Sequence, residues 1–281
     1  MDLKELKQIW EEHGFSPRKT LGQNFLIDKN IKSKILDCLQ LEEDSTVIEI
    51  GPGFGIMSFD LAERCGKLIA IDKDARVCEI MGEIFKGREN ITLINADVLK
   101  TDLCDLVSED ERVTVYGNIP YYISTPIIEK IITQRRCIDV VYMVIQDELA
   151  NRIISPPGPK EYGSLSCFVQ FYIEPKKLFR ITKNCFYPRP KVDSCLIELK
   201  ILEKASVAVK DEEQMFSIIR KSFSQRRKMV INSLSAGGFM SMERDEWLKI
   251  FRVCGIDPAS RAERLSLAEY ARLSDEVLAP K

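Results

Sequence analysis

The sequence predicts an α/β fold: a doubly wound, seven-stranded sheet followed by a smaller helical domain. Short runs rich in Val and Ile alternate with helical patterns as far as residue 202, the order typical of a parallel sheet with crossover helices. The predicted strands cover residues 46–50, 67–71, 91–95, 113–116, 140–145, 165–172 and 194–200. From about residue 205 only helical patterns occur, so we expect a main domain of residues 1–202 and a helical domain of residues 203–281.

The composition is that of a soluble globular protein with a substantial core. Hydrophobic residues make up 45% of the 281 residues and charged residues 30%, which excludes a disordered class. The formal net charge of −2 does not by itself favour a nucleic-acid partner, so only local basic patches could support one. The nine cysteines include no CxxC pair and are odd in number, which indicates neither a disulfide framework nor a zinc site and favours a reducing cytoplasm.

The N-terminal segment contains a short amphipathic helix rather than a targeting signal. Leu3, Leu6, Ile9 and Trp10 have helical spacing, and the pattern ends near Gly14. The segment has acidic residues and lacks a long apolar run, so we expect neither a signal peptide nor a membrane anchor. After a loop of mixed polarity, Asp28 is a candidate N-cap for a helix through Ile31, Ile35 and Leu39.

A glycine turn follows the first predicted strand. Residues 46–50 lead directly into Gly51-Pro-Gly53-Phe-Gly55, and a helical pattern begins after it. Such a turn lets the backbone approach a ligand closely and directs helix N–H groups toward it. However, Ile56 stands where the dinucleotide-binding fingerprint requires a third small residue, so a plain tight turn is the alternative.

Two acidic residues stand at the ends of the next two predicted strands. Asp72 lies about 20 residues beyond the glycines, where a carboxylate can accept both hydroxyls of a ribose. Asp97 could accept a hydrogen bond from an adenine amine, with Val98 packed against the ring. Either aspartate alone could instead be a helix cap, but their succession at consecutive strand ends favours a nucleotide-like ligand.

The stretch Val113 to Thr125, VTVYGNIPYYIST, carries the most specific chemistry. Its strand ends in Asn118-Ile119-Pro120-Tyr121, which would project an amide, a rigid turn and an aromatic ring beyond the sheet. The Asn118 oxygen and a neighbouring backbone carbonyl could accept both hydrogens of a purine amine while Tyr121 stacks on the ring. The alternative is an ordinary turn into the next helix, for which Thr125 is a plausible cap.

Seven segments and the C-terminal tail together resemble one known family. KTLGQNFLID, VIEIGPGFGIMS, IAIDKD, NADVLK, YGNIPYYIST, FYPRPKVDS and FSQRRK are similar, in order, to the motifs of the ribosomal RNA adenine N6-dimethyltransferases, the KsgA/Erm superfamily. The tail GIDPASRAERLSLAEYARLS resembles the bacterial small-subunit branch. Two positions depart from the family pattern, because Asp72 stands where Glu is more frequent and Phe54 where Leu is common.

The resemblance implies a Rossmann-like class I methyltransferase sheet, with residues 203–281 as a helical RNA-recognition domain. It further implies transfer of methyl groups from S-adenosyl-L-methionine to N6 of two adjacent adenosines in the 3′-terminal hairpin loop of 16S rRNA, dimethylating each. The partner would be 16S rRNA within a small ribosomal subunit or its precursor, with a role in subunit biogenesis. We expect a cytoplasmic monomer that needs neither a metal nor a membrane.

The same resemblance assigns individual residues. Those implied for cofactor binding are Gln23, Asn24, Leu26, Gly51, Gly53, Asp72, Asp97, Val98 and Asn118. Those implied for catalysis are Asn118, Ile119, Tyr121 and Phe186, the last as a second ring that sandwiches the target adenine. The candidate RNA contacts are Arg189, Arg226, Arg227 and Lys228. Each basic run alone would more often be a solvated face, and a base pocket beside it is what makes phosphate contacts credible.

The residue types fit this chemistry. The lone pair of an adenine N6 is delocalised into the ring, so acceptors at the Asn118 side chain and the Ile119 carbonyl would favour a more pyramidal, nucleophilic amine. No strong base is needed, since the proton can leave after attack. Catalysis would then rest on orientation and on the charge distribution around the reacting atoms.

Three other functions remain as alternatives. A nicotinamide-dependent oxidoreductase would share the glycine turn and Asp72, but it explains neither the Asn118 motif nor the missing third glycine. A methyltransferase of the large-subunit, antibiotic-resistance branch shares nearly every motif, although the long C-terminal segment argues against it. A non-catalytic ribosome-assembly factor is the third, and the presence of Asn118, Tyr121 and Phe186 favours retained catalysis.

Overall fold

The structure, a computed structural model, describes residues 3–16, 22–225 and 227–278. The chain divides into two compact units, each with its own core. The first comprises Met1–Ala150 and Lys176–Ile201, and the second comprises Asn151–Pro175 and Leu202–Lys281. The packing therefore assigns residues 151–175 to the unit of the C-terminal helices, whereas the sequence suggested an uninterrupted main domain of residues 1–202.

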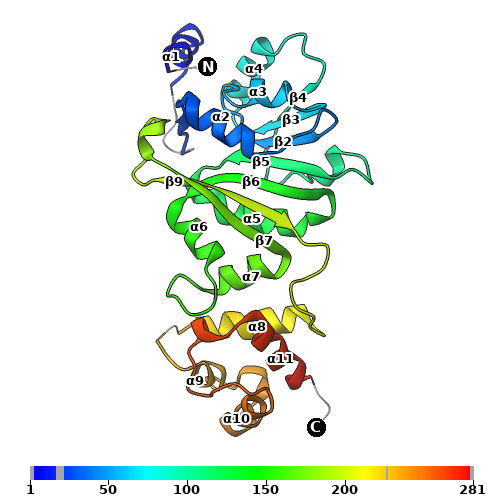
Figure 1. Ribbon diagram of the computed structural model, residues 1–281, viewed down its shortest axis with the longest axis vertical. Coiled ribbons are helices and arrows are strands. Elements are labelled where there is room, and N and C mark those ends of the chain that lie inside the picture. The colour runs from blue at the N-terminus through cyan, green and yellow to red at the C-terminus, as the bar shows by residue number, and fades with distance from the viewer. Residues whose placement is uncertain (1–2, 17–21, 226, 279–281) are drawn as a thin grey trace. The chain divides into compact units, whose positions relative to one another are not determined.

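A seven-stranded sheet forms the centre of the first unit, in the order β4-β3-β2-β5-β6-β9-β7 (Figure 1). Its strands are β2 (Thr46–Ile50), β3 (Lys67–Asp72), β4 (Ile91–Asn95), β5 (Val113–Asn118), β6 (Ile138–Gln146), β7 (Ile173–Ile181) and β9 (Ser194–Ile201). The first five in sequence are parallel, and β9 runs antiparallel to β6. The predicted α/β class is confirmed. The strand order reverses between β2 and β5, so the carboxyl ends of these strands border the crevice where such sheets bind ligands.

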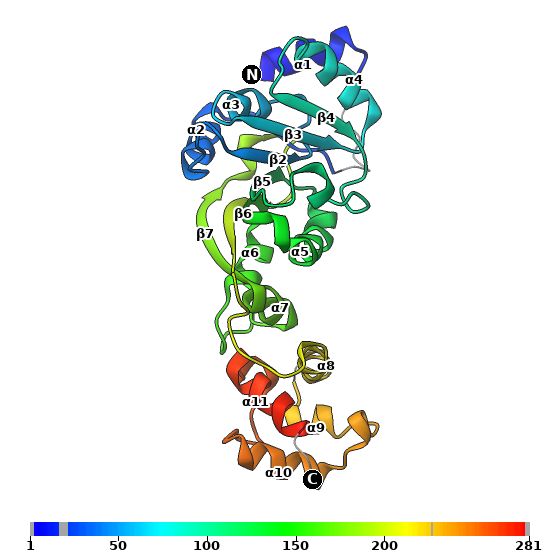
Figure 2. The ribbon, with the colours of Figure 1, turned by 90° about the vertical axis from the view of Figure 1, so that its right-hand side faces the viewer.

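Helices cover the sheet, and Figure 2 shows α2 and α5 on opposite sides of it. The helices that begin in this unit are α1 (Leu3–Glu12), α2 (Lys29–Cys38), α3 (Ser58–Ala62), α4 (Ala75–Ile84), α5 (Ser124–Thr133) and α6 (Asp147–Ile154). The predicted cap of α2 is confirmed, since the Asp28 carboxylate accepts hydrogen bonds from the N–H groups of Asn30 and Ile31. Thr125 was wrong as a cap, because α5 already begins at Ser124, directly after a 3₁₀ turn over Tyr121–Ile123.

One predicted strand was wrong. Residues 165–172 belong to helix α7 (Ser164–Tyr172), and the sheet strand is β7, which follows it. The run LSCFVQFY is mostly apolar, so the spacing of its apolar residues did not distinguish a helix from a strand. Packing decides in favour of a helix, since Cys167 and Phe171 enter the core of the second unit. The sequence of β7 is charged and contains Pro175, which a strand at the edge of a sheet tolerates.

The structure contains one disulfide, although the cysteine pattern indicated no disulfide framework. Cys104 and Cys137 are joined by a disulfide, whereas the other seven cysteines are free. The two residues are 33 positions apart and lie in 3₁₀ turns over Cys104–Leu106 and Arg135–Cys137. Sequence spacing carries no signal for such a pair, because only the fold brings the two turns together.

The second unit is helical, as predicted from residue 205 onward. Besides α7 it contains α8 (Glu212–Phe223), α9 (Val230–Leu234), α10 (Arg244–Val253) and α11 (Leu267–Val277). Trp247, Phe251 and Leu265 are buried in its core, and Leu248 packs against that core. Among the residues placed in the structure, none of the helices combines the length and apolar character needed to cross a membrane.

Candidate active site

A cleft of about 1150 Å³, counting its open mouth, lies at the carboxyl ends of β2, β3, β4 and β5 in the first unit. Its size and position suit a nucleotide-sized ligand. The structure brings all the predicted cofactor-binding and catalytic residues together there. The residues are Gln23, Asn24, Leu26, Gly51, Gly53, Asp72, Asp97, Val98, Asn118, Ile119, Tyr121 and Phe186.

The glycine turn after β2 needs its glycines for two different reasons. Gly51 and Gly53 have φ angles of +71° and +56°, in the left-handed region that side chains disfavour. A Cβ at Gly53 would lie 2.8 Å from Cε1 of Phe25, so a side chain there would collide with the ring. A Cβ at Gly51 would meet no atom of the described residues within 4 Å and would instead occupy space in the cleft.

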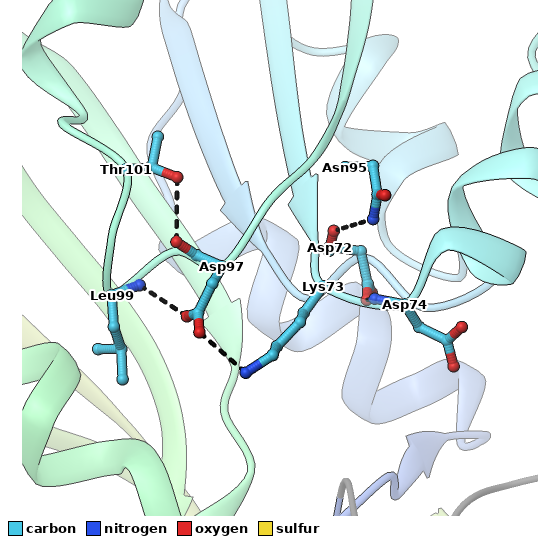
Figure 3. Close-up of polar contacts among 7 residues, drawn as sticks. All are labelled: Asp72, Lys73, Asp74, Asn95, Asp97, Leu99 and Thr101. Carbon is cyan, nitrogen blue, oxygen red and sulfur yellow. Dashed lines mark hydrogen bonds and ion pairs between the residues drawn. The ribbon is translucent and has the colours of Figure 1, made fainter.

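Asp72 ends β3 with its carboxylate held by backbone donors. Its Oδ1 accepts a hydrogen bond of 2.8 Å from the N–H of Asp74, and its carbonyl accepts one of 3.0 Å from the Asn95 side chain (Figure 3). Burial raises the pKa of this carboxyl group to about 6. The carboxyl group is thus fixed in place, and with this pKa it is mostly ionised at neutral pH, so its charge is available to ribose hydroxyls.

Asp97, beyond β4, has both carboxylate oxygens in contact with the protein. Oδ2 forms an ion pair with Nζ of Lys73 at 2.8 Å, and Oδ1 accepts from the N–H of Leu99 at 3.1 Å (Figure 3). The hydrogen bond from Lys73 is the main cause that lowers the pKa of Asp97. Asp97 is therefore ionised at neutral pH, and the exposed Lys73 ammonium lies at the mouth of the cleft. Sequence analysis missed Lys73, for which its position directly after Asp72 was the available signal.

Asn118 ends β5 with a fixed amide. Its Nδ2 donates a hydrogen bond of 2.8 Å to the carbonyl of Asn24, 94 residues earlier in the chain. Only the nitrogen of an amide can donate to a carbonyl, so this bond determines which way the side chain is turned and leaves Oδ1 as the acceptor for a ligand. Asn24 in turn donates from its side chain to the carbonyl of Gly22. The loop before β1 therefore orients the amide that the sequence identified.

Two aromatic residues of the cleft come from distant segments. The Tyr121 hydroxyl lies 2.8 Å from Oγ of Ser194 on β9, which positions the ring. Phe186 is in β8 (Phe186–Tyr187), which pairs antiparallel with β1 (Phe25–Leu26) so that Phe186 lies opposite Leu26. The small sheet thus connects the loop that contacts Asn118 to the strand that supplies Phe186.

Glu49 is a second residue of the cleft that sequence analysis missed. It lies in the middle of the apolar strand β2, is 2% exposed and lines the cleft. Its Oε2 accepts a hydrogen bond of 2.6 Å from the Ser58 hydroxyl. Burial raises its pKa to about 8, so the carboxyl group is largely protonated at neutral pH without a ligand. A lone acid in a strand that is otherwise buried and apolar was the signal.

The predicted RNA contacts are divided between the two units. Arg189 is exposed in the first unit, and Arg227 and Lys228 are exposed in the second. Arg226 lies outside the described residues. Within the described part of the chain, no group of three His, Cys, Asp or Glu side chains could hold a metal ion.

Sheet order, glycine turn and cleft together define an α/β methyltransferase. Residues 14–278 match the family model described as ribosomal RNA adenine dimethylase. The chain is 40% identical over 278 residues to ribosomal RNA small subunit methyltransferase A of Geobacillus thermodenitrificans, covering 97% of this chain and 94% of that protein. The protein of the same name from Pelotomaculum thermopropionicum is 37% identical, with 97% and 95% covered. The chain belongs to the ribosomal RNA adenine dimethylase family.

Solved structures share the fold. A dimethyladenosine transferase from Plasmodium falciparum superposes with a TM-score of 0.77 at 22% identity, covering 89% of this chain and 95% of that one. The 23S rRNA methyltransferase ErmE superposes with a TM-score of 0.70, also at 22% identity, covering 91% and 100%. At this identity the likeness establishes the fold and leaves the substrate to other observations.

Proposed function

We propose that the protein transfers methyl groups from S-adenosyl-L-methionine to N6 of two adjacent adenosines in the 3′-terminal hairpin loop of 16S rRNA. The observation that carries the proposal is the fixed amide of Asn118 in one cleft with two acidic strand ends and two aromatic rings. The substrate is 16S rRNA within a small ribosomal subunit or its precursor, and the product supports subunit biogenesis in the cytoplasm. We expect the protein to act as a monomer.

The cleft fits the cofactor at several points. Gly51 and Gly53 leave space that a side chain would fill, and Asp72 would accept the ribose hydroxyls. Asp97 would accept from the adenine amine while Val98, which is buried, packs against the ring. Gln23 and Asn24 from the loop, and Leu26 from β1, would cover the cofactor from the other side. When bound, the cofactor supplies an electrophilic methyl group on a sulfonium.

Asn118 and Ile119 would orient the attacking amine. The Asn118 oxygen and the Ile119 carbonyl accept its two hydrogens, so the nitrogen lone pair is directed at the methyl carbon. The N6 proton would leave to solvent after methyl transfer, so the cleft needs no strong base beside the amine. The hydrogen bond from Asn118 to Asn24 holds the amide in this orientation before the substrate arrives, which is the basis of catalysis by preorganisation.

Tyr121 and Phe186 would hold the target base. An adenine removed from its neighbours loses stacking, and two aromatic rings in the cleft replace it. Stacking on an aromatic side chain contributes roughly 1 to 3 kcal/mol per base. The hydrogen bond between the hydroxyl groups of Tyr121 and Ser194 positions the Tyr121 ring independently of the substrate. Arg189 from the first unit and Arg226, Arg227 and Lys228 from the second would contact phosphates.

The names of the relatives favour the small subunit over the large one. The proteins from Geobacillus and Pelotomaculum at 37% to 40% identity are both named as small-subunit methyltransferases. A nicotinamide-dependent oxidoreductase is not favoured, since Asn118, Tyr121 and Phe186 would have no task in hydride transfer. A role in subunit assembly is compatible with the same cleft and does not replace its catalytic function.

The test is mass spectrometry of small-subunit RNA after incubation with the protein and isotopically labelled S-adenosyl-L-methionine. Particles should come from cells that lack the modification, so that unmethylated adenosines are available. We expect N6,N6-dimethyladenosine at two adjacent positions of the 3′-terminal hairpin. Labelled large-subunit RNA, or no labelled adenosine at all, would contradict the proposal.

A further inference from the structure

Tyr116 places a buried hydroxyl at the wall of the cleft. Its side chain is 1% exposed, and no residue that the structure describes forms a hydrogen bond with the hydroxyl. Buried polar groups in folded proteins almost always have a partner, and an exception calls for an explanation. Since this hydroxyl belongs to a residue that lines a ligand cleft, the missing partner is most simply an atom of the ligand.

The order of the strands shows which part of the ligand lies there. Asp97 follows β4, Asp72 ends β3, Glu49 is on β2, and Tyr116 is on β5, with the sheet order β4-β3-β2-β5. A ligand whose adenine and ribose contact Asp97 and Asp72 therefore extends its remaining part toward Glu49 and Tyr116. In S-adenosyl-L-methionine this part is the amino-acid end, which carries an α-ammonium and an α-carboxylate group.

Glu49 and Tyr116 form a pair suited to an ammonium group. The two residues are opposite one another in the parallel register of β2 and β5. A carboxylate would repel the α-carboxylate of the ligand and attract its α-ammonium, which has three N–H donors. The Tyr116 phenol stays neutral, because burial raises its pKa, and its oxygen remains an acceptor.

From this geometry we infer that Tyr116 is a further cofactor-binding residue, whose hydroxyl oxygen accepts a hydrogen bond from the α-ammonium group beside the Glu49 carboxylate. The inference rests on the proposed function, since it takes S-adenosyl-L-methionine as the ligand. Tyr116 and Asn118 are two residues apart on one strand and thus lie on the same face of the sheet. The contact would therefore anchor the cofactor next to the residue that orients the methyl acceptor.

The experiment compares the wild-type protein with Tyr116→Phe, which removes only the hydroxyl. Calorimetry measures the dissociation constants of S-adenosylhomocysteine and of 5′-methylthioadenosine, which keeps the adenosine and sulfur but lacks the amino-acid end. We expect roughly a tenfold or larger rise in the constant for S-adenosylhomocysteine, typical of losing a hydrogen bond to a charged group. The constant for 5′-methylthioadenosine should not change.

Tyr142→Phe is the matched control. Tyr142 lies opposite Tyr116 on the adjacent strand β6 and is also buried, but it does not line the cleft. This variant should bind both ligands like the wild-type protein. The thermal unfolding midpoint of ligand-free Tyr116→Phe should not fall, because its hydroxyl has no protein partner among the described residues to lose.

Unchanged affinity of Tyr116→Phe for S-adenosylhomocysteine would overturn the inference, and so would an equal loss for both ligands. An S-adenosylhomocysteine analogue without the amino group provides a test that needs no variant to fold well. The wild-type protein should bind it at least as weakly as Tyr116→Phe binds the parent compound, because the analogue loses the contacts with both Tyr116 and Glu49. Equal binding of analogue and parent by the wild-type protein would also overturn it. Failure of the wild-type protein to bind any of these adenosyl compounds would contradict the proposed function itself.

Discussion

The turn after β2 affects both stability and ligand binding, and glycine-to-alanine variants at Gly51 and Gly53 separate the two effects. Gly53→Ala is the most informative of these variants. Gly53 has a φ of +56°, so alanine there costs about 1 to 2 kcal/mol of stability from backbone strain alone. Its Cβ would also lie 2.8 Å from Cε1 and 3.1 Å from Cδ1 of Phe25. The ring cannot move freely, because its centroid is 5.5 Å from those of both Trp10 and Phe54. Overpacking of this kind typically adds about 1 to 3 kcal/mol.

Gly14 offers a matched control. It has the same φ of +56°, but a Cβ there would meet no atom within 4 Å among the residues that the structure describes. Gly14→Ala should therefore lose only the strain of about 1 to 2 kcal/mol, whereas Gly53→Ala should lose about 2 to 5 kcal/mol in urea denaturation. Gly51→Ala should be as stable as the control but should bind S-adenosylhomocysteine much more weakly, because its methyl group enters the cleft.

Gly53→Ala should also weaken ligand binding, through Phe25. A displaced Phe25 shifts its neighbour Asn24, whose carbonyl accepts the hydrogen bond from Asn118. Denaturation gives the stability of each variant and calorimetry its affinity for S-adenosylhomocysteine. Equal destabilisation of Gly53→Ala and Gly14→Ala, with unchanged affinity in Gly53→Ala, would refute this account of the turn.

Three more predictions concern the base, the RNA and the pH dependence of stability. Tyr121→Ala should impair both RNA binding and methyl transfer, whereas Tyr121→Phe keeps the ring and should retain most of the activity; equal loss in both variants would argue against stacking. Replacing Arg226, Arg227 and Lys228 by Ala should weaken RNA binding and flatten its salt dependence while cofactor affinity is unchanged, and an unaltered salt slope would exclude phosphate contacts. Glu49 has a pKa of about 8 in the folded protein, against an ordinary glutamate pKa of 4.5. Its contribution to stability is therefore complete below pH 4.5 and is lost as the pH rises to about 8. Glu49→Gln should therefore gain stability relative to the ligand-free wild-type protein by about 1.4 kcal/mol per pH unit between pH 5 and 8, and a constant difference in urea denaturation would contradict the raised pKa.

The sequence predicted the parallel half of the sheet well, because strand, turn and helix signals agree there. Each of β2 to β5 is a short apolar run that ends at a residue with turn or ligand chemistry. Prediction failed where tertiary packing decides. The apolar run at residues 165–172 became α7 because Cys167 and Phe171 fill the core of the second unit, and β7 was missed because an edge strand carries charges and a proline.

The cleft residues were predictable where a motif ends a strand, and not where the fold supplies the partner. Asn118 was identified, but its hydrogen bond to Asn24 joins residues 94 positions apart, and no local pattern indicates it. Lys73, Glu49 and Tyr116 were missed, because each role depends on a neighbouring strand. Register places Glu49 opposite Tyr116, and the fold brings Lys73 to Asp97.

The central claim is that Asn118 orients the target amine mainly in the transition state. The most direct test is the single-turnover rate of methyl transfer by Asn118→Ala. The rate is measured at saturating S-adenosyl-L-methionine with unmethylated small subunits, and RNA affinity is measured in the same variant. We predict a rate about a hundred- to a thousand-fold lower, equivalent to about 2.7 to 4 kcal/mol of barrier, with RNA affinity changed little because phosphate contacts elsewhere dominate it. Methyl transfer by Asn118→Ala at a rate near that of the wild-type protein would contradict the claim.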